Sequence, residues 1–316
     1  MKKFLISIDT EGDDLWSWKD GDLITTNNAK YLERFQRLCN ENGFKPTYLT
    51  NYEMAISKDF QRFIKSDCAK GKSEVGMHLH AWNNPPEYPL QYSKENAGAP
   101  YLIEYPEEIM EQKIEYTTNL LENIFEHKMT AHRAGRWAMN ETYFKLIDKY
   151  GYKYDCSVTP SINWEQNAGG TINSKGANYE KYPVTPFNVE KTNILEIPVT
   201  IKSTHHMFAP VKKSLRGVMG SMYNSIQGQK IWLRPTGFNT QKMLWLLDKI
   251  RNDDNLDYIM FMLHSSEFMP GGSPTFRTEE SIDLLYDQIE TVFKAASQHF
   301  EGFTISEYGD SYMSKK

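Results

Sequence analysis

Along most of the chain, short apolar segments alternate with longer segments in which apolar residues recur at helical spacing. Residues 4–8 form a short apolar run before Asp9, and residues 28–42 carry apolar side chains three or four positions apart before Gly43. The first pattern predicts a buried strand and the second an amphipathic helix. The same patterns predict further strands at 46–50, 74–80, 129–133, 153–158, 194–200, 257–263 and 302–306, and further helices at 52–70, 106–127, 140–150, 241–251 and 279–298.

This alternation also indicates the domain organisation. Strands that alternate with helices form parallel βαβ units, and at least seven predicted strands follow one another in this way. One continuous alternation favours a single barrel domain spanning residues 1–316. Residues 159–240 are less regular, and we expect them to form an elaboration of the barrel, with a separate small domain as the alternative.

The charge balance and the length of the apolar runs exclude several classes of protein. The 316 residues include 36 Lys and Arg against 41 Asp and Glu, so the formal net charge is −5 and we expect no nucleic-acid partner. No segment approaches the ~20 consecutive apolar residues of a membrane span. The first apolar run ends at Asp9, too soon for a secretory signal, and the three cysteines form no CxxC motif. We therefore expect a reduced, cytoplasmic protein.

Candidate chemistry gathers where the predicted strands end. In α/β barrels the active site lies at the carboxyl ends of the strands. Four of the eight histidines fall at these ends, together with several acidic residues and an arginine. The polar residues that the pattern places there are Asp9, Glu11, His78, His80, His132, Arg133, Asp155, Ser157, His264 and Glu267.

Two pairs among these residues point to a metal. Asp9 and Glu11 are two positions apart and face the same side of an extended chain, and so do His78 and His80. Two imidazoles, a carboxylate and an open position for water form the ligand set of a catalytic zinc or similar divalent site. The chain contains no GxGxxG, GxSxG or HExxH motif. Its aromatic content of 13% mildly favours a flat ligand such as a sugar, with an aromatic core as the alternative.

Five segments, in order, resemble the motifs of the polysaccharide deacetylase family, also called the NodB-homology family or carbohydrate esterase family 4. They are residues 7–13 (SIDTEGD), 74–82 (EVGMHLHAW), 132–137 (HRAGRW), 154–160 (YDCSVTP) and 262–267 (MLHSSE), and they extend over most of the chain. The resemblance implies an α/β fold, a distorted (β/α)7-type TIM-like barrel of the polysaccharide deacetylase kind. It also implies one bound divalent metal, with Zn²⁺ as the expected ion.

Two of these motifs depart from the commoner family pattern. Asp9-Thr10-Glu11 stands in place of an adjacent Asp-Asp pair, and His78-x-His80 replaces His-x-x-x-His, with Trp82 where the second histidine would stand. Both departures resemble the WbmS-like branch found in O-antigen and capsule gene clusters. The activity that the resemblance implies is metal-dependent removal of an acetyl group from an N-acetylated sugar of a polysaccharide or of its intracellular precursor.

The resemblance further implies a role for each site residue. Glu11, His78 and His80 would bind the metal. Asp9 would be the general base, Arg133 would orient Asp9, and protonated His264 would give a proton to the leaving amine. The reversed assignment, with Asp9 on the metal and Glu11 as the base, stays open. Candidate substrate-binding residues are Trp82, Arg136, Trp137 and Glu267; for Glu267 the alternative is to orient the His264 ring or cap its loop, and for Arg136 a surface salt bridge.

Two other functions stay open. A glycoside hydrolase could use paired carboxylates, Asp9 or Glu11 with Glu267, but it would not need the paired histidines. A catalytically inactive, carbohydrate-binding member of the same fold would not need all six of the residues Asp9, Glu11, His78, His80, Arg133 and His264. Elsewhere, His132 should face away from the site, and the adjacent His205 and His206 should point apart, which disfavours a joint metal site there.

Overall fold

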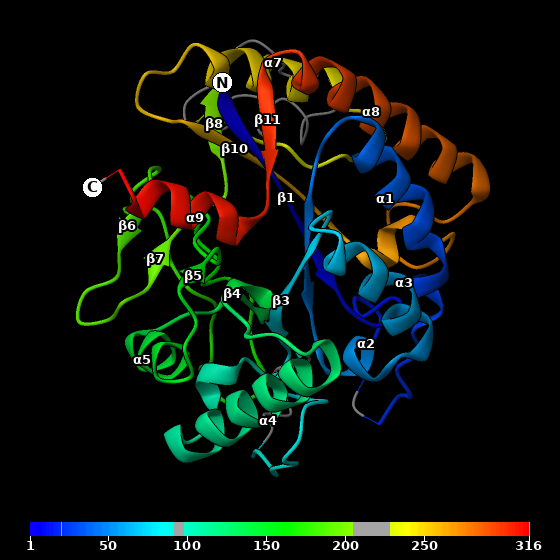
Figure 1. Cartoon of the computed structure of the whole chain (residues 1–316). Coiled ribbons are helices and arrows are strands. Elements are labelled where there is room, and N and C mark those ends of the chain that lie inside the picture. The colour runs from blue at the N-terminus through cyan, green and yellow to red at the C-terminus, as the bar shows by residue number, and fades with distance from the viewer. Residues whose placement is uncertain (20, 92–97, 205–227, 316) are drawn as a thin grey trace, which may run out of the picture.

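The computed structural model describes residues 1–19, 21–91, 98–204 and 228–315 (Figure 1). Its centre is a sheet with the strand order β10-β1-β2-β3-β4-β5-β7-β6, and β11 also pairs with β1. The pairings along this sheet are parallel except that of β6 with β7. The strands are β1 (Lys2–Thr10), β2 (Pro46–Thr50), β3 (Glu74–Leu79), β4 (Ala131–Ala134), β5 (Tyr154–Asp155), β6 (Phe187–Asn188), β7 (Leu195–Glu196), β10 (Tyr258–His264) and β11 (Phe300–Phe303).

The two longest strands, β1 and β10, lie next to each other at one end of this strand order and are largely buried. In β1, every residue from Phe4 to Thr10 is buried, and in β10 every residue from Tyr258 to Leu263 is buried. Parallel strands covered on both faces read as near-continuous apolar runs, which is why these two segments are apolar in sequence. Asp9 and Thr10 interrupt this run because they lie at the edge where the strands end.

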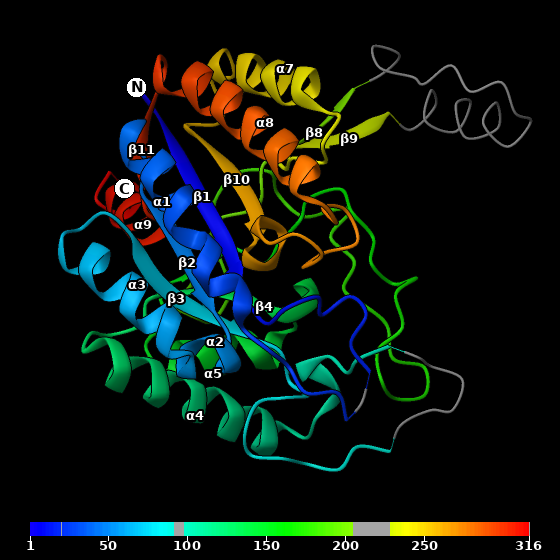
Figure 2. The same cartoon turned by 90° about the vertical axis from the view of Figure 1, so that its right-hand side faces the viewer.

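Helices follow the strands and cover the outer side of the sheet. Figures 1 and 2 show α1, α3 and α4 along one side and α7 packed beside α8 near β10 and β11. Local signals fix the helix ends: the Thr278 side chain accepts a hydrogen bond from Ser281 N, and Glu279 and Glu280 lie in the first turn of α8. The helices are α1 (Leu32–Glu41), α2 (Tyr52–Ile56), α3 (Lys58–Ala69), α4 (Glu107–Phe125), α5 (Glu141–Lys149), α7 (Thr240–Arg251), α8 (Glu279–Ser297) and α9 (Ile305–Met313).

The sheet curls into a half-barrel, as expected for a distorted TIM-like barrel. Arg133 on β4 reaches β1 across two intervening strands, and its Nη2 donates to Ser7 Oγ at 2.8 Å. Residues that follow β7 and β9 (Gln229–Trp232) pack against β10 on the open side: Met262 N donates to Leu233 O at 3.2 Å, and Met260 N donates to the side-chain oxygen Thr200 Oγ1 at 3.0 Å. A separate antiparallel pair, β8 (Ile201–Thr204) and β9, projects beside this opening (Figure 2).

Most predicted elements are confirmed, and the differences have local causes. The predicted helix at 52–70 is two helices, because the Ser57 backbone is extended between α2 and α3. The predicted strand at 302–306 is wrong in its bounds: β11 spans Phe300–Phe303. The Thr304 side chain then accepts a hydrogen bond from Glu307 N and starts α9, a helix that the apolar pattern does not predict. Among the helices of the described residues, none has the length and apolar character needed to cross a membrane.

Candidate active site

The parallel register brings the predicted site residues to one edge of the sheet. Asp9 on β1 is the register partner of His264 on β10, and His78 on β3 is the partner of Arg133 on β4. All four side chains lie at or near the carboxyl ends of their strands, where the barrel geometry predicts chemistry. The site is therefore assembled by strand pairing and not by a flexible loop.

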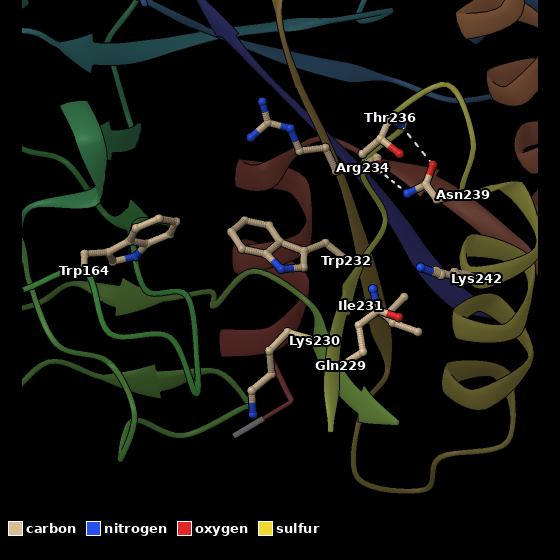
Figure 3. A pocket seen from close by; sticks show the side chains of 9 residues that line it. All are labelled: Trp164, Gln229, Lys230, Ile231, Trp232, Arg234, Thr236, Asn239 and Lys242. Atoms are coloured by element: carbon tan, nitrogen blue, oxygen red, sulfur yellow. Dashed lines mark hydrogen bonds between the residues drawn. The ribbon is translucent and has the colours of Figure 1, made fainter. Parts of the chain in front are cut away.

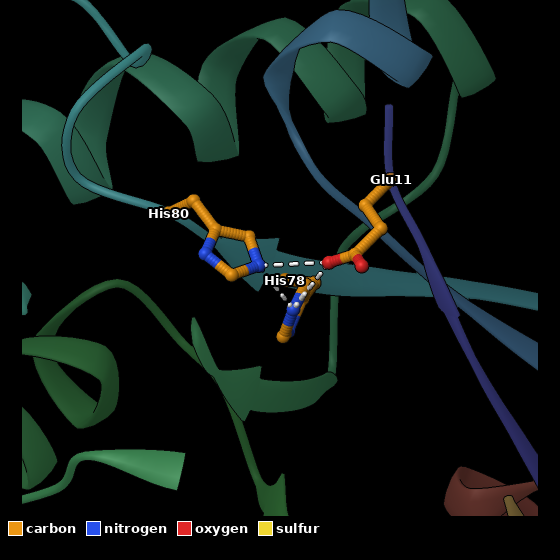
Figure 4. Close-up of side chains that lie close together, drawn as sticks. All are labelled: Glu11, His78 and His80. Carbon is orange, nitrogen blue, oxygen red and sulfur yellow. Dashed lines mark hydrogen bonds and ion pairs between the residues drawn. The ribbon is translucent and has the colours of Figure 1, made fainter. Parts of the chain in front are cut away.

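Three ligand atoms converge from the ends of β1 and β3 (Figure 4). Glu11 Oε2 lies 2.8 Å from His80 Nε2 and 3.6 Å from His78 Nε2, and the two Nε2 atoms are 2.9 Å apart. All three side chains are buried. Two imidazole nitrogens and one carboxylate oxygen around a single point are the donors of an open, catalytic zinc site. Among the described residues, these three form the one cluster with this property.

A hydrogen bond to the backbone orients the His78 ring toward the cluster. His78 Nδ1 lies 2.9 Å from the carbonyl oxygen of Arg133, to which its N–H can donate. Such a bond leaves the Nε2 lone pair directed at the cluster, as in metal-ligating histidines whose other nitrogen binds a carbonyl. His80 Nδ1 is buried without a hydrogen-bond partner in the described structure, so His78 is the more firmly oriented of the two rings.

Arg133 forms a buried ion pair with Asp9. Its Nη1 donates to Asp9 Oδ1 at 2.6 Å, its Nε donates to Cys156 O at 3.1 Å, and its guanidinium lies over the Trp137 ring at 4.8 Å. Arg133 is fully buried and Asp9 is 2% exposed. The structure thus brings Glu11 to the histidines and Asp9 to Arg133, an arrangement that favours Glu11 over Asp9 as a ligand.

The buried charges determine the protonation states of the site. Burial alone would raise the pKa of Asp9, but Arg133, His78 and His264 together outweigh it and lower that pKa. Burial is likewise outweighed at Glu11, where His264, His78 and His80 lower the pKa. Burial opposes protonation of His78, yet the negative Asp9 and Glu11 raise its pKa, whereas burial lowers the pKa of His80. Both carboxylates are therefore ionised near neutral pH, as a ligand and a base require.

His264 lies next to Asp9, and its ring is hydrogen-bonded to the carboxylate of Glu267. Its Nε2 is 3.8 Å from Asp9 Oδ2, and its Nδ1 donates to Glu267 Oε2 at 2.9 Å. Glu267 Oε2 also accepts from the His264 backbone N–H at 2.9 Å, and Arg234 Nη2 lies 3.3 Å from the same oxygen. Burial opposes ionisation of Glu267, but Arg234 and His264 lower its pKa. The carboxylate fixes the ring so that Nε2 faces the site.

These groups open into a cavity of about 440 Å³ with aromatic walls. Trp82 and Trp137 line it, and the Trp82 ring packs on His80 with centroids 4.3 Å apart. Arg136 also lines it, while its guanidinium stacks on Tyr101 at 4.0 Å and Nη2 donates to Ala168 O at 2.8 Å. Of the predicted substrate-binding residues, Trp82, Arg136 and Trp137 thus face the cavity, whereas Glu267 is buried behind His264 at 2% exposure.

The other histidine that the sequence pattern places at a strand end is His132, which lies apart from this site. His132 points away from it, as predicted: the ring is buried, with Nδ1 2.5 Å from Asp155 Oδ2 and Nε2 2.9 Å from Tyr143 Oη. His205 and His206 lie outside the described residues, so their expected separation is not tested.

Sequence patterns missed several cavity residues. Arg234 lies just after β9, in the segment that we predict only as irregular, and Trp16 and Trp18 lie in a loop without a recognisable motif. Trp16 packs edge-on to His264 with ring centroids 4.8 Å apart, and Trp18 lies 5.5 Å from Trp82. The one available signal was the two tryptophans directly after the acidic segment that contains Glu11.

Glu53 supports the chain next to Glu11. Its Oε1 accepts hydrogen bonds from Gly12 N at 3.0 Å and from Asn51 Nδ2 at 2.6 Å. Burial raises the pKa of Glu53 from its usual 4.5 to about 6.

This raised pKa predicts a pH-dependent loss of stability. The unfolded chain releases the Glu53 proton first as pH rises, so the free energy of unfolding falls between about pH 4.5 and pH 6. The difference of about 1.5 pH units corresponds to about 2 kcal/mol. In the metal-free protein, Glu53→Gln should therefore gain about 2 kcal/mol relative to the unsubstituted chain between pH 4.5 and pH 7, measured by urea denaturation. The exposed Glu33→Gln control should gain nothing, and a pH-independent difference for Glu53→Gln would contradict the prediction.

Comparison with known proteins identifies the fold. No family model and no curated protein sequence matches the chain. Among solved structures, a candidate polysaccharide deacetylase from Mycobacterium smegmatis matches with a TM-score of 0.52 and 15% identity, covering 99% of this chain and 91% of its own. A candidate glycoside hydrolase/deacetylase from Parabacteroides distasonis matches with a TM-score of 0.60 and 9% identity, covering 100% of this chain and 72% of its own.

A third structural match belongs to a different class of enzyme. A GH57 branching enzyme from Thermococcus kodakaraensis matches with a TM-score of 0.54 and 11% identity, covering 98% of this chain and 71% of its own. Identities this low show a shared fold only. Because the fold is similar to both deacetylases and a branching enzyme, the activity has to be argued from the side chains of the site.

Proposed function

We propose that the protein is a metal-dependent carbohydrate N-deacetylase, of the polysaccharide deacetylase type and its WbmS-like branch. The observation that carries the proposal is the buried cluster of Glu11, His78 and His80 beside Asp9 and His264. The substrate would be an N-acetylated sugar of a polysaccharide, or of its O-antigen or capsule-type precursor. The aromatic walls of the cavity suit the apolar face of a sugar ring.

In this proposal Glu11, His78 and His80 hold one divalent ion, with Zn²⁺ favoured by the two imidazoles and one carboxylate. Such an ion would supply Lewis-acid chemistry, lowering the pKa of water and polarising an amide carbonyl. Zinc sites of this composition keep a position open for substrate, which fits a cluster facing a cavity.

The other residues move the protons. Asp9 takes a proton from the attacking water as its oxygen bonds to the acetyl carbon, and Arg133 keeps Asp9 ionised and oriented. His264 donates a proton from Nε2 to the amide nitrogen as the C–N bond breaks, so that acetate and a free amine leave. Glu267, hydrogen-bonded to Nδ1, stabilises the protonated ring and is a positioning residue in this scheme.

Acetate release tests the proposal. Zn²⁺-loaded protein should release acetate and free amine in equal amounts from N-acetylated oligosaccharides, and Glu11→Gln should abolish the reaction. New reducing ends without acetate would instead indicate a glycoside hydrolase. The similarity in fold to the GH57 branching enzyme allows this alternative. That alternative is disfavoured because Glu267 is occupied by His264 and Arg234. Binding of the oligosaccharide without any hydrolysis would indicate an inactive carbohydrate-binding protein.

The contact between Glu267 and His264 gives a second prediction. Glu267→Gln keeps the shape of the side chain but removes the negative charge, so we expect acetate release to fall about tenfold, a loss of about 1.4 kcal/mol in transition-state stabilisation. Metal content should not change, since Glu267 does not contact the cluster. Steady-state kinetics with parallel metal analysis measures both quantities; unchanged kinetics would show that Glu267 does not assist His264.

A further inference from the structure

A second cavity, of about 350 Å³, adjoins the catalytic one (Figure 3). Trp164 and Arg234 line both cavities, so the two are neighbours across these residues. The second cavity is bounded by β9 and by the start of α7, and it belongs to none of the motifs that resemble the deacetylase family. Its described lining is Trp164, Gln229, Lys230, Ile231, Trp232, Arg234, Thr236, Asn239 and Lys242.

Tryptophan rings connect the two cavities. Trp137 lines the catalytic cavity, and its ring centroid is 6.2 Å from that of Trp232. Trp232 is in turn 6.3 Å from Trp164, and Figure 3 shows these two indoles directed toward each other. All three rings are partly exposed. The rings thus form a discontinuous aromatic surface that leads from the metal cluster toward β9, and such surfaces suit the apolar faces of successive sugar rings.

The charge of the second cavity is unusual for this protein. Its described lining includes three cationic side chains and no carboxylate, although the chain as a whole has a net charge of −5. Arg234 is paired with Glu267. Lys230 Nζ donates to the neutral Ser203 Oγ at 2.9 Å, and within the described residues neither Lys230 nor Lys242 has a carboxylate partner. Two lysines without counter-charge in one cavity favour an anionic ligand.

We propose that this second cavity is a subsite for a negatively charged group of the glycan, so that the substrate is an acidic oligosaccharide and not a neutral one. The proposal rests on the proposed function in one respect: the N-acetylated unit would occupy the catalytic cavity. The neighbouring unit would pass over Trp232, and its anionic group would lie at Lys230 or at Lys242, whose side chains lie on different sides of β9 in Figure 3. That group is either the carboxylate of a sugar acid or a phosphate.

Binding measurements with three probes test the subsite and distinguish these two sources. The probes are a neutral N-acetylglucosamine tetrasaccharide, a tetrasaccharide in which N-acetylglucosamine alternates with glucuronic acid, and UDP-N-acetylglucosamine. Tryptophan fluorescence titration of the metal-loaded protein gives the three dissociation constants. We expect about tenfold tighter binding of at least one anionic probe than of the neutral one, weakened by added salt. Preference for the glucuronic acid probe indicates a carboxylate, and preference for the nucleotide sugar indicates a phosphate.

Lysine variants test whether the preference for an anionic probe arises in the second cavity. Lys230→Ala with Lys242→Ala should lower the ratio of anionic to neutral affinity about tenfold, whereas Lys249→Ala, on the same helix but outside the cavity, should not change it. Equal affinity for all three probes, or a preference that persists in the double variant with an unchanged melting temperature, would overturn the subsite. A lysine-dependent preference in a protein that releases no acetate would contradict the proposed function alone, because the readout is binding.

Discussion

Replacing His264 with alanine is expected to lower acetate release by about 10²- to 10⁴-fold, the usual contribution of a general acid. An amine leaves an amide only after its nitrogen is protonated, and His264 Nε2 is the donor that faces Asp9 across the site, 3.8 Å from Oδ2. Metal content should be unchanged, because His264 is not one of the three clustered ligands. Steady-state kinetics and metal analysis of the same preparation measure both effects.

The matched control is His127→Ala, which removes an exposed histidine whose ring hydrogen-bonds to the carbonyl of Phe125 and lies 6.5 Å from the Phe125 ring. It should leave acetate release and metal content unchanged. If His264→Ala retained activity within about twofold of the unsubstituted chain, His264 would not be the general acid. If it lost the metal as well as activity, the ring would belong to the ligand set instead.

Replacing Arg133 with methionine is expected to destabilise the metal-free protein by about 3–5 kcal/mol. The substitution leaves Asp9 buried and ionised without its partner, which lies 2.6 Å away in the fully buried pair. It also removes the hydrogen bonds to Ser7 Oγ and Cys156 O that connect β4 to β1 and β5. Urea denaturation at neutral pH measures the loss in the free energy of unfolding.

Two further variants make this result specific. The double variant Asp9→Asn, Arg133→Met removes the uncompensated charge, so it should recover part of the lost stability. If Arg133→Met alone does not fold, the double variant is the one to measure. Arg34→Met removes an exposed guanidinium that lies 3.4 Å from Asp283 and should cost less than about 1 kcal/mol. A loss of that small size for Arg133→Met would show that Asp9 is not held as an isolated buried charge.

The central part of the site was predictable because it depends on strand pairing. Asp9 and His78 each lie at or near the end of a predicted strand, and parallel strands end at the same edge of a sheet, so their positions along the chain are enough to place them at one edge. The sequence leaves open whether Asp9 or Glu11 is the ligand, whereas the structure places Asp9 against Arg133 and Glu11 against His80.

Residues outside this alternation could not be predicted in the same way. Arg234 reaches Glu267 because β9 and the residues after it lie beside β10, a long-range packing that no local pattern encodes. The helix α9 begins at the Thr304 cap, directly after β11. The apolar residues of the strand and of the helix therefore form one continuous pattern in the sequence, and the helix is not recognised. The strands β5 and β7 are each two residues long, although the sequence predicts longer strands there, at 153–158 and 194–200.

The most direct test of the central claim is a titration of metal-free protein with Zn²⁺ in which bound metal and the rate of acetate release are followed together. The Glu11, His78 and His80 cluster predicts that both rise in parallel and saturate at about one ion per chain, and that neither rises in the His78→Ala, His80→Ala variant. Acetate release that is independent of bound metal, or an absence of metal binding in the unsubstituted chain, would contradict a metal-dependent deacetylase.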